Sequence, residues 1–157
     1  MVNQLTKMIT TFFYAGYFPR FPGTFTSFLT AVICYFFPLN IIYYIGMFSV
    51  VTLLGLVLSH KMEIIVGKKD PSCVVIDEVA GMFVACFLLP KSILIYFAAF
   101  VLFRFFDIRK PFPVKQLESL KGSLGIMSDD LMAGIYTNIF LHGALFFITA
   151  ITSSTIL

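Results

Sequence analysis

At residues 70–81 the chain reads Asp-Pro-Ser-Cys-Val-Val-Ile-Asp-Glu-Val-Ala-Gly, which begins as a polar loop and continues into an apolar segment. Two adjacent carboxylates, Asp77 and Glu78, lie inside the apolar part. An ionised carboxylate at mid-bilayer depth costs roughly 2.5–3.5 kcal/mol on insertion scales. The pair therefore requires a partner that offsets its charge: a basic side chain, a metal ion or a proton.

The composition around this stretch is that of an integral membrane protein. Hydrophobic residues make up 59% of the 157 residues and charged residues only 12%, whereas a soluble domain carries about 25% charged residues. The length suits one domain over residues 1–157. A net charge of +3 gives no support for a nucleic-acid partner, and three scattered cysteines argue against a disulfide framework or a zinc site.

Apolar runs separated by polar or proline-containing breaks predict an all-α fold. We expect a membrane-embedded bundle of about four to five helices, with a short interfacial helix at the N-terminus. The expected interfacial helix covers residues 4–18, and the expected membrane helices cover 27–39, 41–59, 72–89, 92–106 and 131–152.

Local patterns give some polar residues a structural explanation. Asp70 before Pro71 is typical of a helix N-cap, and Ser128 suits the cap of the last helix, with two acids in its first turn. Gly81 follows Asp77 by four residues and shares its helix face. The missing side chain leaves room either for a ligand or for the close approach of another helix.

A loop over residues 16–27 contains two prolines and two glycines and precedes an expected helix start. It is an ordinary capped loop or an anion site, in which free backbone N–H groups, Thr24 and Arg20 would bind a phosphate.

The distribution of Lys and Arg predicts the orientation. Basic residues gather in the polar loops 60–72 and 104–130 and near the N-terminus, which places these regions on one side of the membrane. That side is expected to be cytoplasmic. Seven of the eight acidic residues, all except Glu118, are expected to cluster at this same face of the membrane.

Carboxylates with interleaved Arg and Lys, and without cysteine ligands, suit a hard cation such as Mg²⁺ together with a phosphate. A lipid phosphate at the membrane face would match this chemistry. A small ion or proton transporter that uses the buried acids is the alternative. His60 is a further candidate acid or base, although a histidine at a helix end is more often only solvated.

Three blocks in order resemble the phosphatidylglycerophosphatase A family and together cover nearly the whole chain. The first is Pro22-Gly-Thr with Ser27; the second combines Glu63, Asp70-Pro71 and Val75-Ile-Asp-Glu-Val-Ala-Gly81; the third is Arg104-Phe-Phe-Asp-Ile-Arg-Lys-Pro-Phe-Pro113 with Gly125-Ile-Met-Ser-Asp-Asp-Leu-Met-Ala-Gly134. Phe21, Thr26 and Gly122-Ser123 depart from the family pattern, in loop positions and not at the acids. The signature of the CDP-alcohol phosphotransferases is absent.

The resemblance implies a Mg²⁺-dependent phosphatase of phospholipid biosynthesis in the bacterial inner membrane, with its active site at the cytoplasmic face. It would convert phosphatidylglycerophosphate to phosphatidylglycerol and phosphate, by attack of water in preference to a covalent aspartyl-phosphate. The implied catalytic residues are Asp77, Glu78, Asp107, Asp129 and Asp130, and the implied metal ligands are Glu63, Asp77, Glu78, Asp129 and Asp130. The implied substrate-binding residues are Arg104, Lys110, Thr24 and Arg20.

Overall fold

The computed structural model describes residues 2–36 and 40–155, and within these ranges it contains helices and no strand. The elements are α1 (Val2–Thr10), the short 3₁₀ helix η1 (Ala15–Tyr17), α2 (Pro22–Phe36), α3 (Ile41–Val66), α4 (Ile76–Ala85), α5 (Ile93–Arg109), α6 (Val114–Glu118) and α7 (Ser123–Thr155). The all-α prediction is confirmed. Part of the predicted break at residues 38–40 lies outside the described residues.

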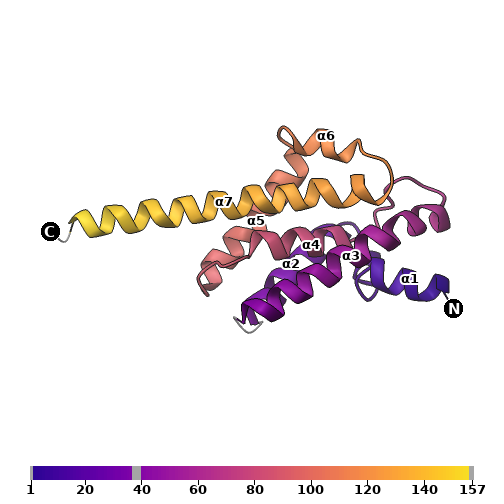
Figure 1. Cartoon of the computed structure of the whole chain (residues 1–157), viewed down its shortest axis with the longest axis horizontal. Coiled ribbons are helices and arrows are strands. Elements are labelled where there is room, and N and C mark those ends of the chain that lie inside the picture. Colours follow the sequence, from indigo (N-terminus) through magenta and orange to yellow (C-terminus); the bar gives the residue numbers. More distant parts are fainter. Residues whose placement is uncertain (1, 37–39, 156–157) are drawn as a thin grey trace.

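Helix α4 is the centre of the arrangement, since it packs against α2, α3, α5 and α7 (Figure 1). Nearly all of its residues are buried, among them Val79, Ala80 and Met82. Helix α7 lies along α4 and then continues well beyond the other helices to the C-terminus, while the short α6 packs on its first half. The sequence 76–85 therefore forms a core helix that is surrounded by protein.

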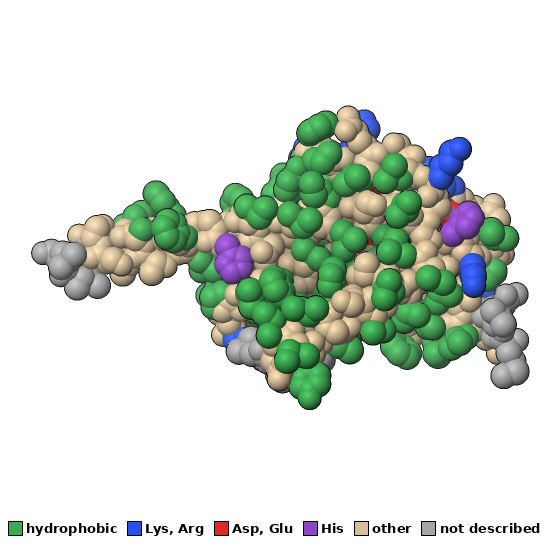
Figure 2. All heavy atoms as spheres, in the orientation of Figure 1, with side chains coloured by type: hydrophobic (Ala, Val, Ile, Leu, Met, Phe, Trp, Pro, Cys, Tyr) green, Lys and Arg blue, Asp and Glu red, His purple; other side chains and the backbone are tan. Residues whose placement is uncertain are grey.

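Two helices in the described part of the chain are long and apolar enough to cross a membrane, over Ile41–Val66 and Ser123–Ser154. Helix α4 has ten residues, so it is only about 15 Å long at 1.5 Å per residue, half of a bilayer's hydrocarbon thickness of about 30 Å. The predicted four to five membrane spans are therefore not confirmed. Large exposed hydrophobic side chains cover much of the face in Figure 2, as expected for a membrane protein.

Several predicted helix ends are wrong because local backbone geometry overrides the apolar pattern. The expected helix over 4–18 ends at Thr10, after which Phe12, Phe13 and Tyr14 adopt left-handed backbone angles. Helix α3 continues through the polar residues after His60 and ends where Gly67, with a φ of 72°, forms a left-handed C-cap.

The two predicted caps are also wrong. Asp70 has a φ of 46°, outside the extended region of a cap, and α4 begins only at Ile76. Ser128 lies inside α7, which begins at Ser123, and its hydroxyl donates to the carbonyl of Leu124. Asp129 and Asp130 consequently lie in the second turn of α7, where the neighbouring helices decide what they contact.

Candidate active site

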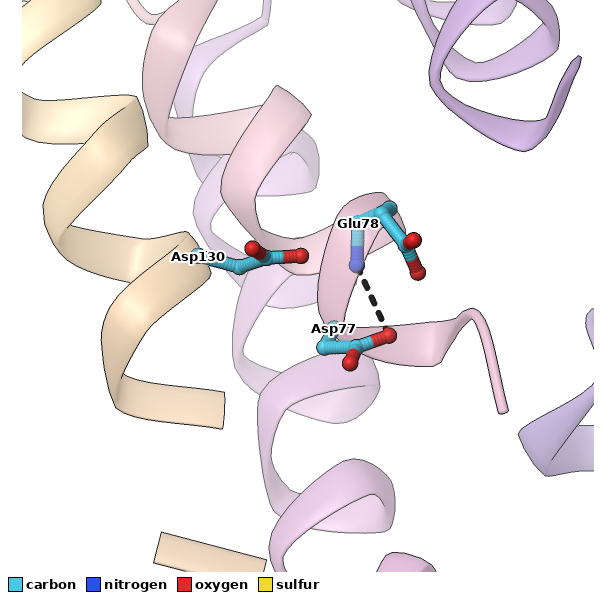
Figure 3. A group of neighbouring side chains, drawn as sticks. All are labelled: Asp77, Glu78 and Asp130. Atoms are coloured by element: carbon cyan, nitrogen blue, oxygen red, sulfur yellow. Dashed lines mark hydrogen bonds between the residues drawn. The ribbon is translucent and has the colours of Figure 1, made fainter. Parts of the chain in front are cut away.

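A cluster of three carboxylates lies where the first turn of α4 meets α7. Ligand atoms of Asp77, Glu78 and Asp130 all lie within 4.8 Å of one another (Figure 3). Asp77 and Asp130 are buried, at 8% and 4% exposure. The backbone N–H of Glu78 donates to Asp77 Oδ1 at 3.0 Å, so the first carboxylate also accepts a hydrogen bond at the helix start. The structure thus joins residues that are more than fifty positions apart in the sequence.

Two glycines allow the helices to cross closely enough to form this cluster. A Cβ atom added at Gly81 would lie 2.7 Å from the carbonyl oxygen of Asp130, and one added at Gly134 would overlap the carbonyl oxygen of Gly81. Gly81 is therefore a helix-packing position, which resolves the alternatives left by the sequence. The close crossing of α4 and α7 carries Asp130 to the Asp77 and Glu78 carboxylates.

The start of α2 and the end of α5 close the other side of the cluster. Arg104 Nη1 lies 2.7 Å from Asp107 Oδ2 and 3.7 Å from Glu78 Oε1, and all three side chains are largely buried. A Cβ atom added at Gly23 would overlap Glu78 Oε1 and lie 3.3 Å from Arg104 Nη1. The glycine of the Pro22-Gly-Thr block therefore lets the first turn of α2 lie directly against this ion pair.

Lys110 forms a second charged group next to the cluster. Its Nζ lies 2.9 Å from Asp129 Oδ2 and 2.9 Å from Glu118 Oε1. Burial opposes the ammonium charge, but the hydrogen bonds and the attraction of the two carboxylates outweigh it and raise the pKa of Lys110. Lys110 therefore stays charged at neutral pH, and it neutralises Asp129, the neighbour of Asp130 on α7.

Five polar atoms in these groups are buried without a hydrogen-bond partner in the described structure. They are Glu78 Oε2, Asp129 Oδ1, Asp130 Oδ2, and Nε and Nη1 of Arg104, of which Nη1 lies within ion-pair distance of Asp107. A buried polar atom without a partner costs about 1–3 kcal/mol, more when charged, so each favours a ligand. Carboxylate oxygens without cysteine sulfur match a hard divalent cation, and a guanidinium N–H matches a phosphate oxygen.

The remaining predicted site residues lie in different surroundings. Glu63 is not part of the three-carboxylate cluster: its Oε2 lies 2.9 Å from His60 Nδ1, and its Oε1 accepts the backbone N–H of Asp70 at 3.0 Å. Thr24 is half-buried and follows Gly23 in the first turn of α2, whereas Arg20 is exposed with a φ of 73°.

The sequence interpretation missed two features of the site. One is Glu118 as the second partner of Lys110, and the other is the packing role of Gly23 and Gly134. Both glycines stand inside the motif blocks, so their positions were visible, but the atoms they approach were not.

The comparisons with known proteins agree with this geometry. The family model described as Phosphatidylglycerophosphatase A matches residues 8–145. A phosphatidylglycerophosphatase A of Escherichia coli is 32% identical over 142 residues, covering 87% of this chain and 78% of that protein. A phosphatidylglycerophosphatase A of Haemophilus influenzae is 44% identical over 86 residues, which cover 54% of this chain and 53% of that protein.

A relative from Bacteroides thetaiotaomicron carries a different, provisional name, phosphatidylinositol-3-phosphatase. It is 37% identical over 142 residues, covering 85% of this chain and 89% of that protein. No solved structure matches the chain. The family model and the relatives together confirm the resemblance seen in the three blocks, and the chain belongs to the phosphatidylglycerophosphatase A family of phosphatases.

Proposed function

We propose that this chain hydrolyses the terminal phosphomonoester of phosphatidylglycerophosphate, with Mg²⁺ held by the carboxylates at the crossing of α4 and α7. The observation that carries the proposal is the cluster of Asp77, Glu78 and Asp130, in which Glu78 Oε2 and Asp130 Oδ2 lack hydrogen-bond partners within residues 2–36 and 40–155. The cluster lies beside two cationic side chains, Arg104 and Lys110. Water adds to the phosphorus, the bond to the glycerol oxygen breaks, and phosphatidylglycerol and inorganic phosphate are released.

Asp77, Glu78 and Asp130 would hold the cation, with Asp129 beside them on α7. When bound, the cation would neutralise charge on the phosphoryl oxygens and polarise the phosphoryl group. The donor set fits Mg²⁺, which takes oxygen ligands and keeps several waters. Three carboxylates within 4.8 Å of one another repel strongly without a cation, so the cluster favours a divalent ion.

The cationic side chains would bind the phosphate. Asp107 orients Arg104 through the 2.7 Å contact. Arg104 Nε, which has no hydrogen-bond partner in the part of the chain that the structure describes, would donate to a phosphate oxygen. Lys110 supplies a second positive charge and is held in place by Asp129 and Glu118. Thr24 and the exposed Arg20 are further contacts for the phosphate near the start of α2. Because acids hold Arg104 and Lys110 in place before substrate arrives, little free energy is lost to ordering these two side chains.

We also propose that the site faces the cytoplasm. The lysines and arginines of 60–72 and 104–121 border the cluster in sequence, and Lys and Arg side chains favour the cytoplasmic side. On the face that Figure 2 shows, the visible Lys and Arg side chains lie mainly on the side of the molecule away from the protruding C-terminal part of α7. The lipid tails would then remain in the bilayer while the phosphate reaches the acids.

The transporter interpretation lacks support. The family is a phosphatase family, and the described acidic side chains gather around one end of α4 instead of along a path through the helices. A conduction path requires polar groups throughout the membrane.

The test is phosphate release from phosphatidylglycerophosphate by the purified protein in detergent, with Mg²⁺ and with EDTA. Asp77→Asn keeps the size of the side chain and should lower kcat by at least about a hundredfold, since it removes a charge from the cluster. Lys61→Gln, an exposed change outside the site, is the control. Near-normal activity of a folded Asp77→Asn variant would remove Asp77 from the site.

Phosphatidylinositol 3-phosphate belongs in the same assay because of the Bacteroides relative's name. A preference for that lipid would overturn the proposed substrate while leaving the phosphatase chemistry intact.

A further inference from the structure

A polar pocket of about 320 Å³ lies beside the site, between α6, the start of α7 and the loop before α4. The charged and hydroxyl-bearing residues that line it are Lys69, Asp70, Lys115, Glu118, Ser119 and Asp129. A second polar hollow, lined among others by Glu63, Lys68 and Lys121, shares Lys69 and Gly122 with this pocket but does not include Asp129 or Glu118. Three other hollows are lined mainly by aromatic and aliphatic side chains and are suited to lipid. The pocket at Asp129 and Glu118 is suited to a polar group.

The pocket connects directly to the groups that we assign to phosphate binding. Asp129 belongs to the lining, and its Oδ2 holds Lys110 at 2.9 Å. Its side chain is about nine-tenths buried, and Oδ1 has no hydrogen-bond partner among the described residues. Glu118, also in the lining, holds the same Lys110 from the α6 side. A ligand in the pocket would thus lie one side chain away from the proposed phosphate site.

The pocket also offers positive charge that is not already used. Lys69 and Lys115 are exposed, and neither forms an ion pair with any acid in the described ranges 2–36 and 40–155. The hydroxyl of Ser119, which donates to the carbonyl oxygen of Gln116 at 2.6 Å, and the half-exposed carboxylate of Glu118 can accept hydrogen bonds from alcohol groups. Two free cations next to hydroxyl-binding groups match a phosphodiester that is joined to an alcohol.

A substrate of the proposed kind has these parts next to its reacting phosphate. In phosphatidylglycerophosphate, a glycerol unit links the terminal phosphomonoester to a phosphodiester, and the phosphodiester continues to the lipid. When the terminal phosphate lies at Arg104 and Lys110, the glycerol and the diester must occupy neighbouring space. The pocket that adjoins Lys110 through Asp129 and Glu118 is such a space.

We propose that this pocket binds the alcohol and the phosphodiester of the substrate, and so determines which phosphorylated head group the enzyme accepts. Lys69 and Lys115 pair with the diester phosphate, while Ser119 and Glu118 bind the hydroxyl groups. The proposal rests on the proposed lipid phosphatase function, and it adds residues of α6 and its following loop, which contribute none of the reacting groups.

The first experiment measures binding and does not depend on turnover. Calorimetry compares the deacylated head group, glycerophosphoglycerophosphate, with glycerol 3-phosphate, which lacks the diester, on the full-length protein in detergent. Wild type should bind the former more tightly, and the double variant Lys69→Gln/Lys115→Gln should lose that preference. Equal affinities for both compounds in wild type would overturn the pocket assignment.

The second experiment uses the kinetics of phosphate release. Lys115→Gln should raise KM for phosphatidylglycerophosphate by about fivefold, the upper effect of one exposed charge pair, with little change in kcat, because the contact is made before and during the reaction. Ser119→Phe, in an exposed turn, should act in the same direction by filling the pocket. Lys61→Gln is the matched control.

An unchanged KM in both variants, or an equal loss of kcat, would refute a head-group role. Absence of turnover in wild type would instead refute the proposed function, and the binding comparison would still decide the pocket.

Discussion

Gly23→Ala is the substitution that best distinguishes an effect on the active site from an effect on the stability of the fold. The added methyl group would overlap Glu78 Oε1 and lie 3.0 Å from Glu78 Cδ, next to Arg104 Nη1. The atom it meets is the end of a flexible side chain, so the carboxylate is expected to move by about 1 Å or more while the helices keep their places. The change therefore shifts a proposed metal ligand and an ion pair without adding or removing a charge.

The expected magnitudes differ strongly between stability and activity. Replacing glycine by alanine in a helix favours folding by at most about 1 kcal/mol. The largely buried Glu78–Arg104 pair is 3.7 Å apart and Arg104 keeps its closer partner Asp107 at 2.7 Å, so disturbing the pair is expected to cost about 1 kcal/mol, less than the roughly 3–5 kcal/mol of a buried charge that loses its partner. The net change in the free energy of unfolding is then within about 1 kcal/mol. A misplacement of about 1 Å at a reacting centre costs around a hundredfold in rate, or about 2.7 kcal/mol.

The assay is phosphate release in detergent, together with thermal unfolding of the same samples. Gly46→Ala is the matched control, since a Cβ atom there meets nothing within 4 Å. We expect a loss of about a hundredfold in kcat for Gly23→Ala, with a Tm close to that of the control. A Gly23→Ala variant with wild-type kcat would refute the inferred contact between α2 and the Glu78 carboxylate.

Three further predictions follow from the same contacts. Gly134→Ala should destabilise the fold by about 1–3 kcal/mol, because its methyl group meets the Gly81 carbonyl oxygen; thermal unfolding against Gly143→Ala, which meets nothing, checks this, and equal Tm values would contradict it. Asp130→Asn should weaken Mg²⁺ binding measured by calorimetry and abolish the difference between Mg²⁺ and EDTA in the activity assay, so unchanged Mg²⁺ affinity would remove Asp130 from the ligand set. Glu63→Ala should cost about 1 kcal/mol of stability by leaving the Asp70 N–H without its acceptor while Mg²⁺ affinity stays unchanged, whereas a large loss of affinity would restore Glu63 as a ligand.

The helical class was predictable because long apolar runs are visible in the order of residues. Helix ends were less predictable, since they depend on backbone angles such as the left-handed ones at Asp70 and Gly67. The predicted number of membrane spans was not confirmed, and there is a physical reason. An apolar segment such as 76–85 is equally apolar whether lipid or other helices surround it, and only its length and its neighbours distinguish the two.

The sequence by itself determined the family, the enzyme class and the residue types of the site, because the three motif blocks occur in order in one chain. Only the tertiary structure decided which partner each acidic side chain contacts. Asp129 and Asp130 are neighbours on α7, yet successive residues of a helix point about 100° apart, so one meets Lys110 and the other meets Asp77 and Glu78. Which partner each acid contacts depends on the close crossing of α4 and α7 at their glycines. The residue pattern of one helix does not indicate which other helix packs against it.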